Sequence, residues 1–316
     1  MWPDDGDNAE ELIKTADIAM YEAKRRGKGR YQYYSSTMED AAARRLALET
    51  RLRCALDTGQ LLLYYQPKVE VASGRIIGFE ALLRWHDPVF GVITPDEFIP
   101  LAEETGLIIP ITAWVLGEAC RQTKQWQETG LGDLSVSINV SGIDVDRSNL
   151  SAIVAKTLAE TGLSAESLVL ELTETCVMTA QDKVAPTLAG LNARGVRIAL
   201  DDFGTGYSSL NRLKQLPIDE LKIDQSFLAN LPTSQDDAAI VSMITAIAQT
   251  LHLKVTAEGV ETQEMFKFIK AARCDYAQGF LFSSPVPAES IPRLLKSFEG
   301  VSGLPDAKAS GKSAAS

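Results

Sequence analysis

The chain has 316 residues, of which 45% are hydrophobic, and it carries a formal net charge of −11. This length fits one large domain with an added fragment or two modest domains, and the apolar content is sufficient for a buried core. The acidic balance argues against binding to DNA or RNA polymers or to anionic lipid, but a carboxylate site that holds cations can still accept an anionic small ligand.

No stretch approaches the roughly 18 consecutive apolar residues of a membrane-spanning helix, and the acidic start lacks the pattern of a signal peptide. We therefore expect a cytoplasmic protein without a membrane segment in this chain. The cysteines have no metal-binding spacing and are interpreted as reduced structural residues. They are Cys54, Cys120, Cys176 and Cys274.

The first 35 residues predict a helix and a short strand. Asp7–Asn8 is suited to cap a helix that continues to Arg26, and glycines follow directly. Arg30–Tyr34 then alternates in polarity, which predicts a strand. A helix and one strand bury too little surface to fold alone, so residues 1–35 are either an accessory of the rest or the end of another domain.

A connecting helix is predicted over residues 36–58, where leucines recur at helical spacing. The large domain covers residues 59–300. The tail, residues 301–316, is rich in Ser, Ala, Gly and Lys and is predicted to be disordered.

Strand-like runs alternate with helical stretches throughout the large domain. The runs are Leu61–Val71, Ile76–Trp85, Leu134–Val140, Leu168–Thr173, Arg197–Asp202, Glu220–Asp224, Lys254–Gly259 and Tyr276–Phe282. The helical stretches include Ile111–Thr129, Ser151–Thr161, Asp182–Arg194 and Ala238–Leu251. This alternation predicts an α/β fold, and the number of strands favours a closed TIM-like (β/α)8 barrel. Because only Ala72–Arg75 joins the first two runs, they should form an antiparallel hairpin.

Polar and charged side chains stand late in these apolar strands. They are Glu80, Asn139, Glu171, Asp201, Asp202, Lys222, Asp224, Glu258 and Gln278. Any one of them has a plain structural explanation, such as a buried ion pair. In a barrel, however, the strand ends meet at one mouth, and crowded carboxylates there repel one another unless cations compensate.

Oxygen ligands of this kind suit Mg²⁺ or Mn²⁺ rather than zinc. His86 and His252 lie outside the pattern and are interpreted as ordinary surface or structural residues. The segment Asp201–Ser209 leads from the acidic pair into a loop that contains glycines, which favours a catalytic or gating loop over a simple connection.

The sequence Glu-Ala-Leu-Leu-Arg, which begins at Glu80, resembles the signature of EAL-domain cyclic di-GMP phosphodiesterases. Further motifs of that family follow the same order along residues 45–295. They are Tyr65–Lys68, Phe98–Leu107, Glu171–Glu174, Asp201–Ser209, Leu221–Asp224, Ala257–Thr262 and Gln278–Phe280. The resemblance implies a TIM-like barrel with an antiparallel first strand, a homodimer, and hydrolysis of cyclic di-GMP to linear pGpG by water that two Mg²⁺ or Mn²⁺ ions activate.

The resemblance also implies roles for individual residues. Metal contacts, direct or through water, would come from Glu80, Asn139, Glu171, Asp201, Asp202, Glu258 and Gln278, with Asp201 bridging the two ions. Contacts to the phosphate and guanine would come from Gln66, Leu82, Arg84 and Asp224. Lys222, Glu258 and Asp202 would take part in the chemistry, with the role of Glu258 as base or as ligand left open. Glu174 and Glu261 would brace the Asp202–Ser209 loop.

The N-terminal piece resembles the last helix and strand of a GGDEF diguanylate cyclase domain, in Ala16–Lys24 and Gly27–Tyr31. The Gly-Gly-Asp-Glu-Phe signature is absent from the sequence, so we expect no cyclase activity, and we expect this chain to be a piece of a longer GGDEF–EAL protein. One departure from the EAL pattern lies near the metal-site strand, where Gly-Ile-Asp-Val follows Ser141.

Two alternatives stay open. An EAL fold can act as a receptor that binds cyclic di-GMP without cutting it, although such members generally lack several metal ligands. An unrelated metal-dependent barrel enzyme would also satisfy the carboxylate pattern, and only the set of motifs argues against it.

Overall fold

The structure is a computed structural model that describes residues 8–25, 31–179, 181–206, 213–298 and 300. The chain divides into two compact units, one formed by Met1–Gln60 with His86–Leu107, the other by Leu61–Trp85 with Ile108–Ser316. The tail predicted to be disordered, residues 301–316, lies outside the described residues.

The smaller unit is mainly helical. Its elements are α1 (Ala9–Arg25), α2 (Ser36–Ala55), β3 (Gly91–Ile93) and α3 (Pro95–Thr105). The side chain of Asn8 accepts a 2.9 Å hydrogen bond from the Glu11 amide and so caps the start of α1. The predicted connecting helix is present as α2, in which Leu48 and Leu52 are buried.

The strand predicted at Arg30–Tyr34 is wrong for the part that the structure describes, because residues 31–34 have no strand conformation. Alternating polarity indicates a strand only where a neighbouring strand supplies hydrogen-bond partners. None of the described strands pairs with this segment, and Tyr31 and Tyr33 are exposed. Arg30 itself lies outside the described residues.

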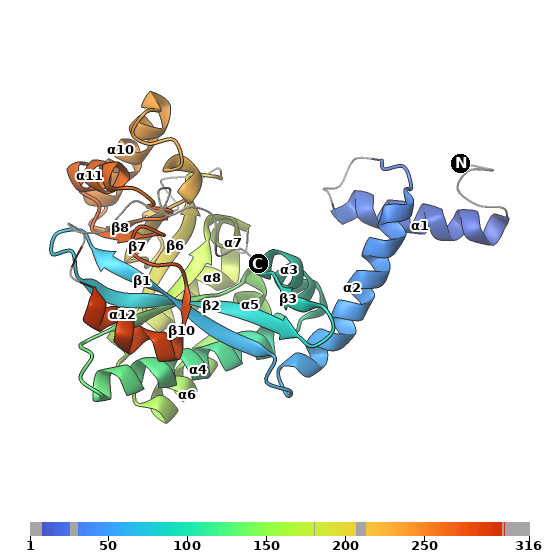
Figure 1. Ribbon diagram of the computed structural model, residues 1–316, viewed down its shortest axis with the longest axis horizontal. Coiled ribbons are helices and arrows are strands. Elements are labelled where there is room, and N and C mark those ends of the chain that lie inside the picture. The colour runs from blue at the N-terminus through green and yellow to red at the C-terminus, as the bar shows by residue number, and fades with distance from the viewer. Residues whose placement is uncertain (1–7, 26–30, 180, 207–212, 299, 301–316) are drawn as a thin grey trace. The chain divides into compact units, whose positions relative to one another are not determined.

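The larger unit contains the predicted barrel, whose parallel strands run side by side in Figure 1. Its strands are β1 (Leu61–Glu70), β2 (Ile76–Asp87), β4 (Ser135–Asn139), β5 (Leu168–Thr173), β6 (Arg197–Phe203), β7 (Glu220–Ile223), β8 (Lys254–Ala257) and β9 (Tyr276–Gln278). They pair in the order β1-β9-β8-β7-β6-β5-β4-β2, and an additional β1–β2 pairing closes the ring. The last residues of β2 belong to the smaller unit.

The first strand is antiparallel to its neighbours, as the short link after it predicted. β1 pairs in this sense with β2, with β9 and with the short β10 (Val286–Pro287), whereas the ladders from β2 through β4 to β9 are parallel. Gln66 lies opposite Glu80 in the β1–β2 register, and Lys68 lies opposite Gln278 in the β1–β9 register. The closed mixed barrel expected from the sequence is therefore confirmed.

Helices connect the parallel strands and cover their outer faces. They are α4 (Ile108–Glu128), α5 (Gly142–Arg147), α6 (Leu150–Thr161), α7 (Glu174–Thr179), α8 (Gln181–Asn192), α10 (Gln235–Thr250), α11 (Gln263–Ala271) and α12 (Ile291–Ser297). Short 3-10 turns lie at η1 (Ala165–Ser167), η2 (Gln225–Phe227) and η3 (Ala288–Ser290). Figure 1 shows α4 and α6 lying side by side along the barrel.

Aromatic side chains pack α4 against the barrel. The ring of Trp126 lies 4.8 Å from that of Tyr65 on β1 and 5.3 Å from that of Phe79 on β2. All three side chains are buried, so Tyr65 and Phe79 point outward from the barrel into the core between the sheet and α4. Because neighbouring residues of a strand point to opposite faces, Gln66 and Glu80 are directed to the interior of the barrel.

Among the described residues, no single helix is long and apolar enough to cross a membrane, and α3 and α4 meet that criterion only when the two are added together.

Candidate active site

The strand-end residues predicted from the sequence meet at the carboxyl ends of the parallel strands. Glu80 of β2 is buried and accepts hydrogen bonds from the amide of Asn139 at 2.7 Å and from the amide of Gln278 at 2.6 Å. The Gln278 amide also donates to the side chain of Gln66 at 3.0 Å. Two amide side chains thus hold the Glu80 carboxylate, and a third, that of Gln66, accepts from one of them.

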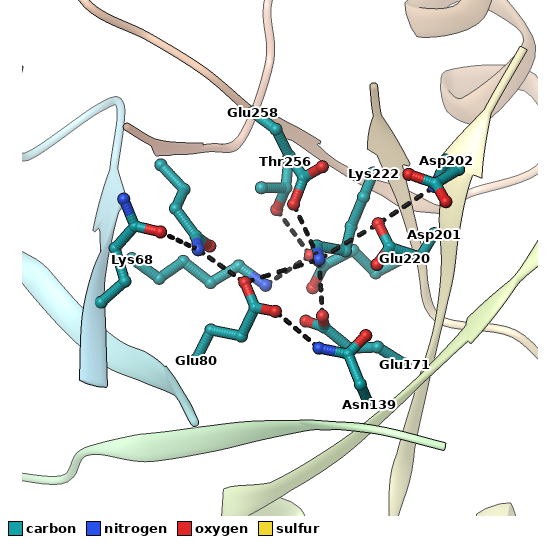
Figure 2. Close-up of polar contacts among 12 residues, drawn as sticks. Lys68, Glu80, Asn139, Glu171, Asp201, Asp202, Glu220, Lys222, Thr256 and Glu258 are labelled. Carbon is teal, nitrogen blue, oxygen red and sulfur yellow. Dashed lines mark hydrogen bonds and ion pairs between the residues drawn. The ribbon is translucent and has the colours of Figure 1, made fainter. Parts of the chain in front are cut away.

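Lys222 of β7 lies at the centre of the acidic residues, as Figure 2 shows. Its ammonium group is 2.5 Å from Glu171, 2.7 Å from Glu258, 3.1 Å from Asp201 and 3.8 Å from Glu80. Only 1% of the Lys222 side chain is exposed, so these charges interact without much screening by water. One lysine therefore faces four carboxylates, and the group retains a negative charge.

A bulge in β6 brings two consecutive aspartates to the same site. The β6–β7 register shifts between Leu200 and Phe203, so that β6 contains one residue more than its partner over this stretch. Asp202 has a φ of 54°, a left-handed conformation that aspartate tolerates better than most residues. In a regular strand Asp201 and Asp202 would point to opposite faces, and the bulge removes that restriction.

Burial raises the pKa of Glu171 to about 8, against the opposing charge of Lys222 and with support from Glu80 and Asp201. Burial likewise raises the pKa of Glu258 to about 8, although Lys222 opposes it. Glu80 behaves differently: burial favours its neutral form, but Lys222 and the two amide donors outweigh it and lower its pKa. The pKa of Lys222 is raised because the surrounding carboxylates outweigh its burial. Glu171 and Glu258 thus resist ionisation as long as no further cation compensates their burial.

These residues fit divalent cations. Asp201, Asp202 and Glu258 each offer an oxygen, and the three atoms lie within 4.8 Å of one another. Among the described residues, the buried Oε1 atom of Glu171 has no hydrogen-bond partner. Leaving such an atom without a partner is costly, and a metal ion would satisfy it. The donors are carboxylate and amide oxygens, which suit Mg²⁺ or Mn²⁺.

A cavity of about 260 Å³ opens beside the acidic residues. Gln66, Glu80, Glu258 and Gln278 line one part of it, so the predicted metal and substrate residues share this space. Gly279 is needed for the close approach of two chain segments, since a Cβ atom there would lie 2.2 Å from the carbonyl oxygen of Val260.

Two of the predicted substrate residues lie further along β2. Leu82 and Arg84 follow Glu80 at alternate positions of β2 and therefore share its face. Arg84 donates a 2.9 Å hydrogen bond to the Leu83 carbonyl, and its guanidinium lies 5.5 Å from the ring centre of Tyr64. Neither contact engages a carboxylate, which leaves the guanidinium charge uncompensated by these neighbours.

Asp224 has a local role in the structure. Its Oδ1 atom accepts a 3.0 Å hydrogen bond from the Ser226 amide at the start of η2. It also lies near Asp202, whose pKa is raised by burial and by the charges of Asp201 and Asp224. The structure thus places Asp224 beside the acidic cluster.

Glu174 anchors the loop that follows β6. Its Oε2 atom accepts a 3.0 Å hydrogen bond from the amide of Gly204, and its Oε1 atom would lie 2.7 Å from a Cβ atom at Gly206. Glu261 lines the cavity of about 260 Å³ beside the acidic residues. Tyr207–Ser209, the last part of the predicted gating loop, lie outside the described residues.

Two groups of residues received no predicted role, although Lys68 and Phe280 stand inside the family motifs. Lys68, Glu220 and Thr256 form a buried polar group deeper in the barrel. Gln225, Phe280 and Pro285 line the cavity, and Phe280 is 56% exposed. Spacing offered a signal for the first group, because Glu220 and Thr256 each stand two residues before a predicted site residue.

His86 and His252 are exposed, and the described carboxylates of the site make their contacts without either histidine. Among the cysteines, Cys54 is exposed, and Cys120, Cys176 and Cys274 are buried and unbridged. Burial raises the pKa of both Cys120 and Cys274 to about 12, so these thiols stay protonated at neutral pH.

Comparison with known proteins places these features in one family. Residues 49–285 match the model of the EAL domain. The chain is 46% identical over 291 residues to the bifunctional diguanylate cyclase/cyclic di-GMP phosphodiesterase MucR of Pseudomonas aeruginosa, covering 92% of this chain and 42% of MucR. It is 41% identical over 298 residues to the cyclic di-GMP phosphodiesterase NbdA of the same organism, covering 94% of this chain and 38% of NbdA.

A solved structure of the MucR phosphodiesterase in complex with cyclic di-GMP superposes with a TM-score of 0.75 at 48% identity. The match covers 78% of this chain and 99% of that chain. In contrast, the chain spans less than half the length of the curated relatives MucR and NbdA.

Proposed function

The chain belongs to the EAL-domain family, and from this premise we propose that it hydrolyses cyclic di-GMP to linear pGpG with the help of two divalent cations. The observation that carries the proposal is the convergence of Glu80, Glu171, Asp201 and Glu258 on one buried lysine at the barrel mouth. A receptor that only binds the dinucleotide has no need to concentrate so many carboxylates beside its pocket. Relatives named as cyclic di-GMP phosphodiesterases support the choice of substrate.

The cations would be Mg²⁺ or Mn²⁺. The residues that would hold them are Glu80, Asn139, Glu171, Asp201, Asp202, Glu258 and Gln278. When bound, the ions polarise the phosphodiester and lower the pKa of a water molecule. The partnerless Glu171 oxygen and the surplus of negative charge support this assignment.

The chain's own residues bind and orient the substrate. Arg84, four residues beyond Glu80 on β2, carries a guanidinium that can pair with a phosphate. Leu82 lies between Arg84 and Glu80 on the same strand, and Gln66 lies opposite Glu80. Lys222 holds a permanent positive charge because the surrounding carboxylates raise its pKa, so it can stabilise charge on the phosphoryl oxygens in the transition state. Water adds to phosphorus, the bond to one 3′-oxygen breaks, and that oxygen takes up a proton.

Glu258 is the residue best placed to move a proton. Its carboxylate contacts Lys222 at 2.7 Å and lines the cavity, and its raised pKa lies close to neutrality. The same oxygens also suit a metal ligand, so the two roles compete for one side chain.

The domain assignment is part of the proposal. Residues 1–35 would be the end of a GGDEF domain, 36–58 a connecting helix and 59–300 the EAL barrel. The name of MucR, which includes diguanylate cyclase activity, and the greater length of both curated relatives support it. A homodimer is proposed by resemblance to the family and would be checked by sedimentation velocity.

The test is to incubate the purified chain with cyclic di-GMP and Mg²⁺ and to separate the products by chromatography. We expect pGpG to form with Mg²⁺ and to disappear when a chelator is added. If the substrate stays intact while equilibrium dialysis shows that it is bound, the chain is a cyclic di-GMP receptor and not a phosphodiesterase.

A further inference from the structure

Three buried polar side chains form a layer below the carboxylates. Lys68 of β1 and Glu220 of β7 make an ion pair, and the Thr256 hydroxyl of β8 donates a 2.5 Å hydrogen bond to the same Glu220 oxygen. Lys68 and Glu220 are each 4% exposed and Thr256 is 0% exposed. The Lys68 ammonium also lies 5.2 Å from the ring centre of Tyr276. We call Lys68, Glu220 and Thr256 the lower layer.

The lower layer adjoins the site. Glu220 stands two residues before Lys222 on β7, and residues two apart on a strand share a face. Lys68 lies opposite Gln278 in the β1–β9 register. Figure 2 shows Lys68, Glu220 and Thr256 close to Lys222 and Glu80. Such stacking of inward side chains in layers is a general property of these barrels.

Stability alone does not account for charges at this depth. Barrel interiors are usually filled by Val, Ile and Leu, and a buried ion pair is often no more stabilising than apolar residues of similar volume. Opposite charges are instead paired here: Lys68 pairs with Glu220, and Lys222, two residues further along β7, contacts the carboxylates. Lys68 is near enough to lower the pKa of Glu80, although burial, Lys222 and the amide donors have larger effects.

We propose that the Lys68–Glu220 ion pair of the lower layer sets the divalent-cation affinity of the site, because Glu220 neutralises Lys68, so that the Lys68 ammonium neither repels bound cations nor pairs with Glu80. Glu220 and Lys68 are thus positioning residues that act through the carboxylates above them. The inference rests on the metal site of the proposed function and adds residues to which that function assigned no role.

The experiment measures Mn²⁺ affinity by titration calorimetry in the absence of nucleotide. Glu220→Gln leaves the Lys68 charge uncompensated, and we expect affinity to fall about tenfold because an unscreened charge at this range opposes a cation strongly. The double variant Lys68→Met with Glu220→Gln removes both charges and should return to within about twofold of the wild type. Thr256→Val removes a hydrogen bond from the same layer without changing charge, and it should also stay within about twofold.

Circular dichroism checks that each variant is folded. If Glu220→Gln does not fold, Lys68→Met alone carries the test, and it should bind Mn²⁺ at least as tightly as the wild type. Equal affinity in Glu220→Gln and the wild type, a double variant as weak as Glu220→Gln, or weaker binding in Lys68→Met would overturn the inference. A wild-type chain that binds no Mn²⁺ would contradict the proposed metal site itself and the inference with it.

Discussion

At the scale of single residues, burial and neighbouring charges have opposite effects on the ionisation of the site carboxylates. Glu171 and Lys222 are both 1% exposed and lie 2.5 Å apart, yet one oxygen of Glu171 has no hydrogen-bond partner among the described residues. A buried carboxylate with one satisfied and one open oxygen is costly in the protein alone. The open oxygen of Glu171 is therefore free to bind a cation, and the four carboxylates around Lys222 distinguish it from the similarly open Oε1 atom of Glu174, which lies beside Gly206.

Glu171→Gln tests that assignment. The change keeps the shape of the side chain but removes its charge, so we expect Mn²⁺ affinity to fall by about 100-fold or more, since even outer residues of metal sites are worth 10–100-fold. Titration calorimetry measures the affinity. The exposed Glu128→Gln on α4 is the matched control and should bind as the wild type. Unchanged affinity in Glu171→Gln would remove Glu171 from the ligand set.

The Lys68–Glu220 pair predicts a pH dependence of stability. Burial opposes ionisation of Glu220, but Lys68 and the Thr256 hydroxyl outweigh it and lower its pKa below the ordinary value of 4.5. Between the folded pKa and 4.5 the unfolded chain binds more protons, so this contribution is present above pH 4.5 and is lost as pH falls through the folded pKa.

Urea unfolding at pH 7 and at pH 3.5, about one unit below the unfolded pKa, measures this contribution. We expect the free energy of unfolding to fall more steeply with acid in the wild type than in Lys68→Met with Glu220→Gln. Parallel pH profiles for the two proteins would show that the pair adds nothing to acid sensitivity.

Sequence reasoning predicted the upper residues of the site and missed the lower ones for a physical reason. An isolated Glu80 or Glu171 in an apolar strand costs free energy, which makes it conspicuous. Lys68 lies in a segment that reads as an ordinary strand, and Thr256 is a favoured strand residue, so neither stands out. Only the closed barrel brings Glu220 into contact with both Lys68 and Thr256.

At the scale of elements, β6 decides whether the site can form. Its bulge and the left-handed conformation of Asp202 allow consecutive aspartates to face one site. Glycine-bearing turns after Asp202 were predictable from the sequence, but the bulge was not, because it depends on the register against β7. The strand predicted at Arg30–Tyr34 failed for the related reason that a strand needs a partner.

Two substitutions of Asp202 separate backbone conformation from charge. Asn tolerates the left-handed region, so Asp202→Asn should change the free energy of unfolding by less than about 0.5 kcal/mol while weakening Mn²⁺ binding. Val is β-branched and strained in this conformation, so Asp202→Val should lower the free energy of unfolding by a further ~1–3 kcal/mol. Urea unfolding measures both. Equal stability of the two variants would show that the φ of 54° is not maintained in solution.

At the scale of the whole molecule, cation binding should stabilise the folded chain. A ligand present at 100 times its dissociation constant adds about 2.7 kcal/mol, which corresponds to a rise in Tm of roughly 4 °C for a chain of this size. Differential scanning calorimetry with MgCl₂ measures the shift, with NaCl of equal ionic strength as control. Asp202→Asn should show a smaller shift, and an identical shift would place the stabilising ion elsewhere.

The order of elements in the large domain was accessible from the sequence because strand and helix differ in period and because Ala72–Arg75 is too short for a parallel crossover. The division into compact units was not accessible. His86–Leu107 belongs with the N-terminal residues, although it lies inside the stretch that the family motifs cover. Local sequence patterns carry no information on which segments share a core.

In the proposed reaction, water opens a phosphodiester of cyclic di-GMP. Mass spectrometry of the product formed in ¹⁸O-labelled water with Mg²⁺ tests it most directly. We expect pGpG with a single ¹⁸O atom in its 5′-phosphate, and no product with a chelator or in Glu171→Gln. Cyclic di-GMP recovered unchanged under conditions in which Mg²⁺ is bound, or pGpG without the label, would contradict it.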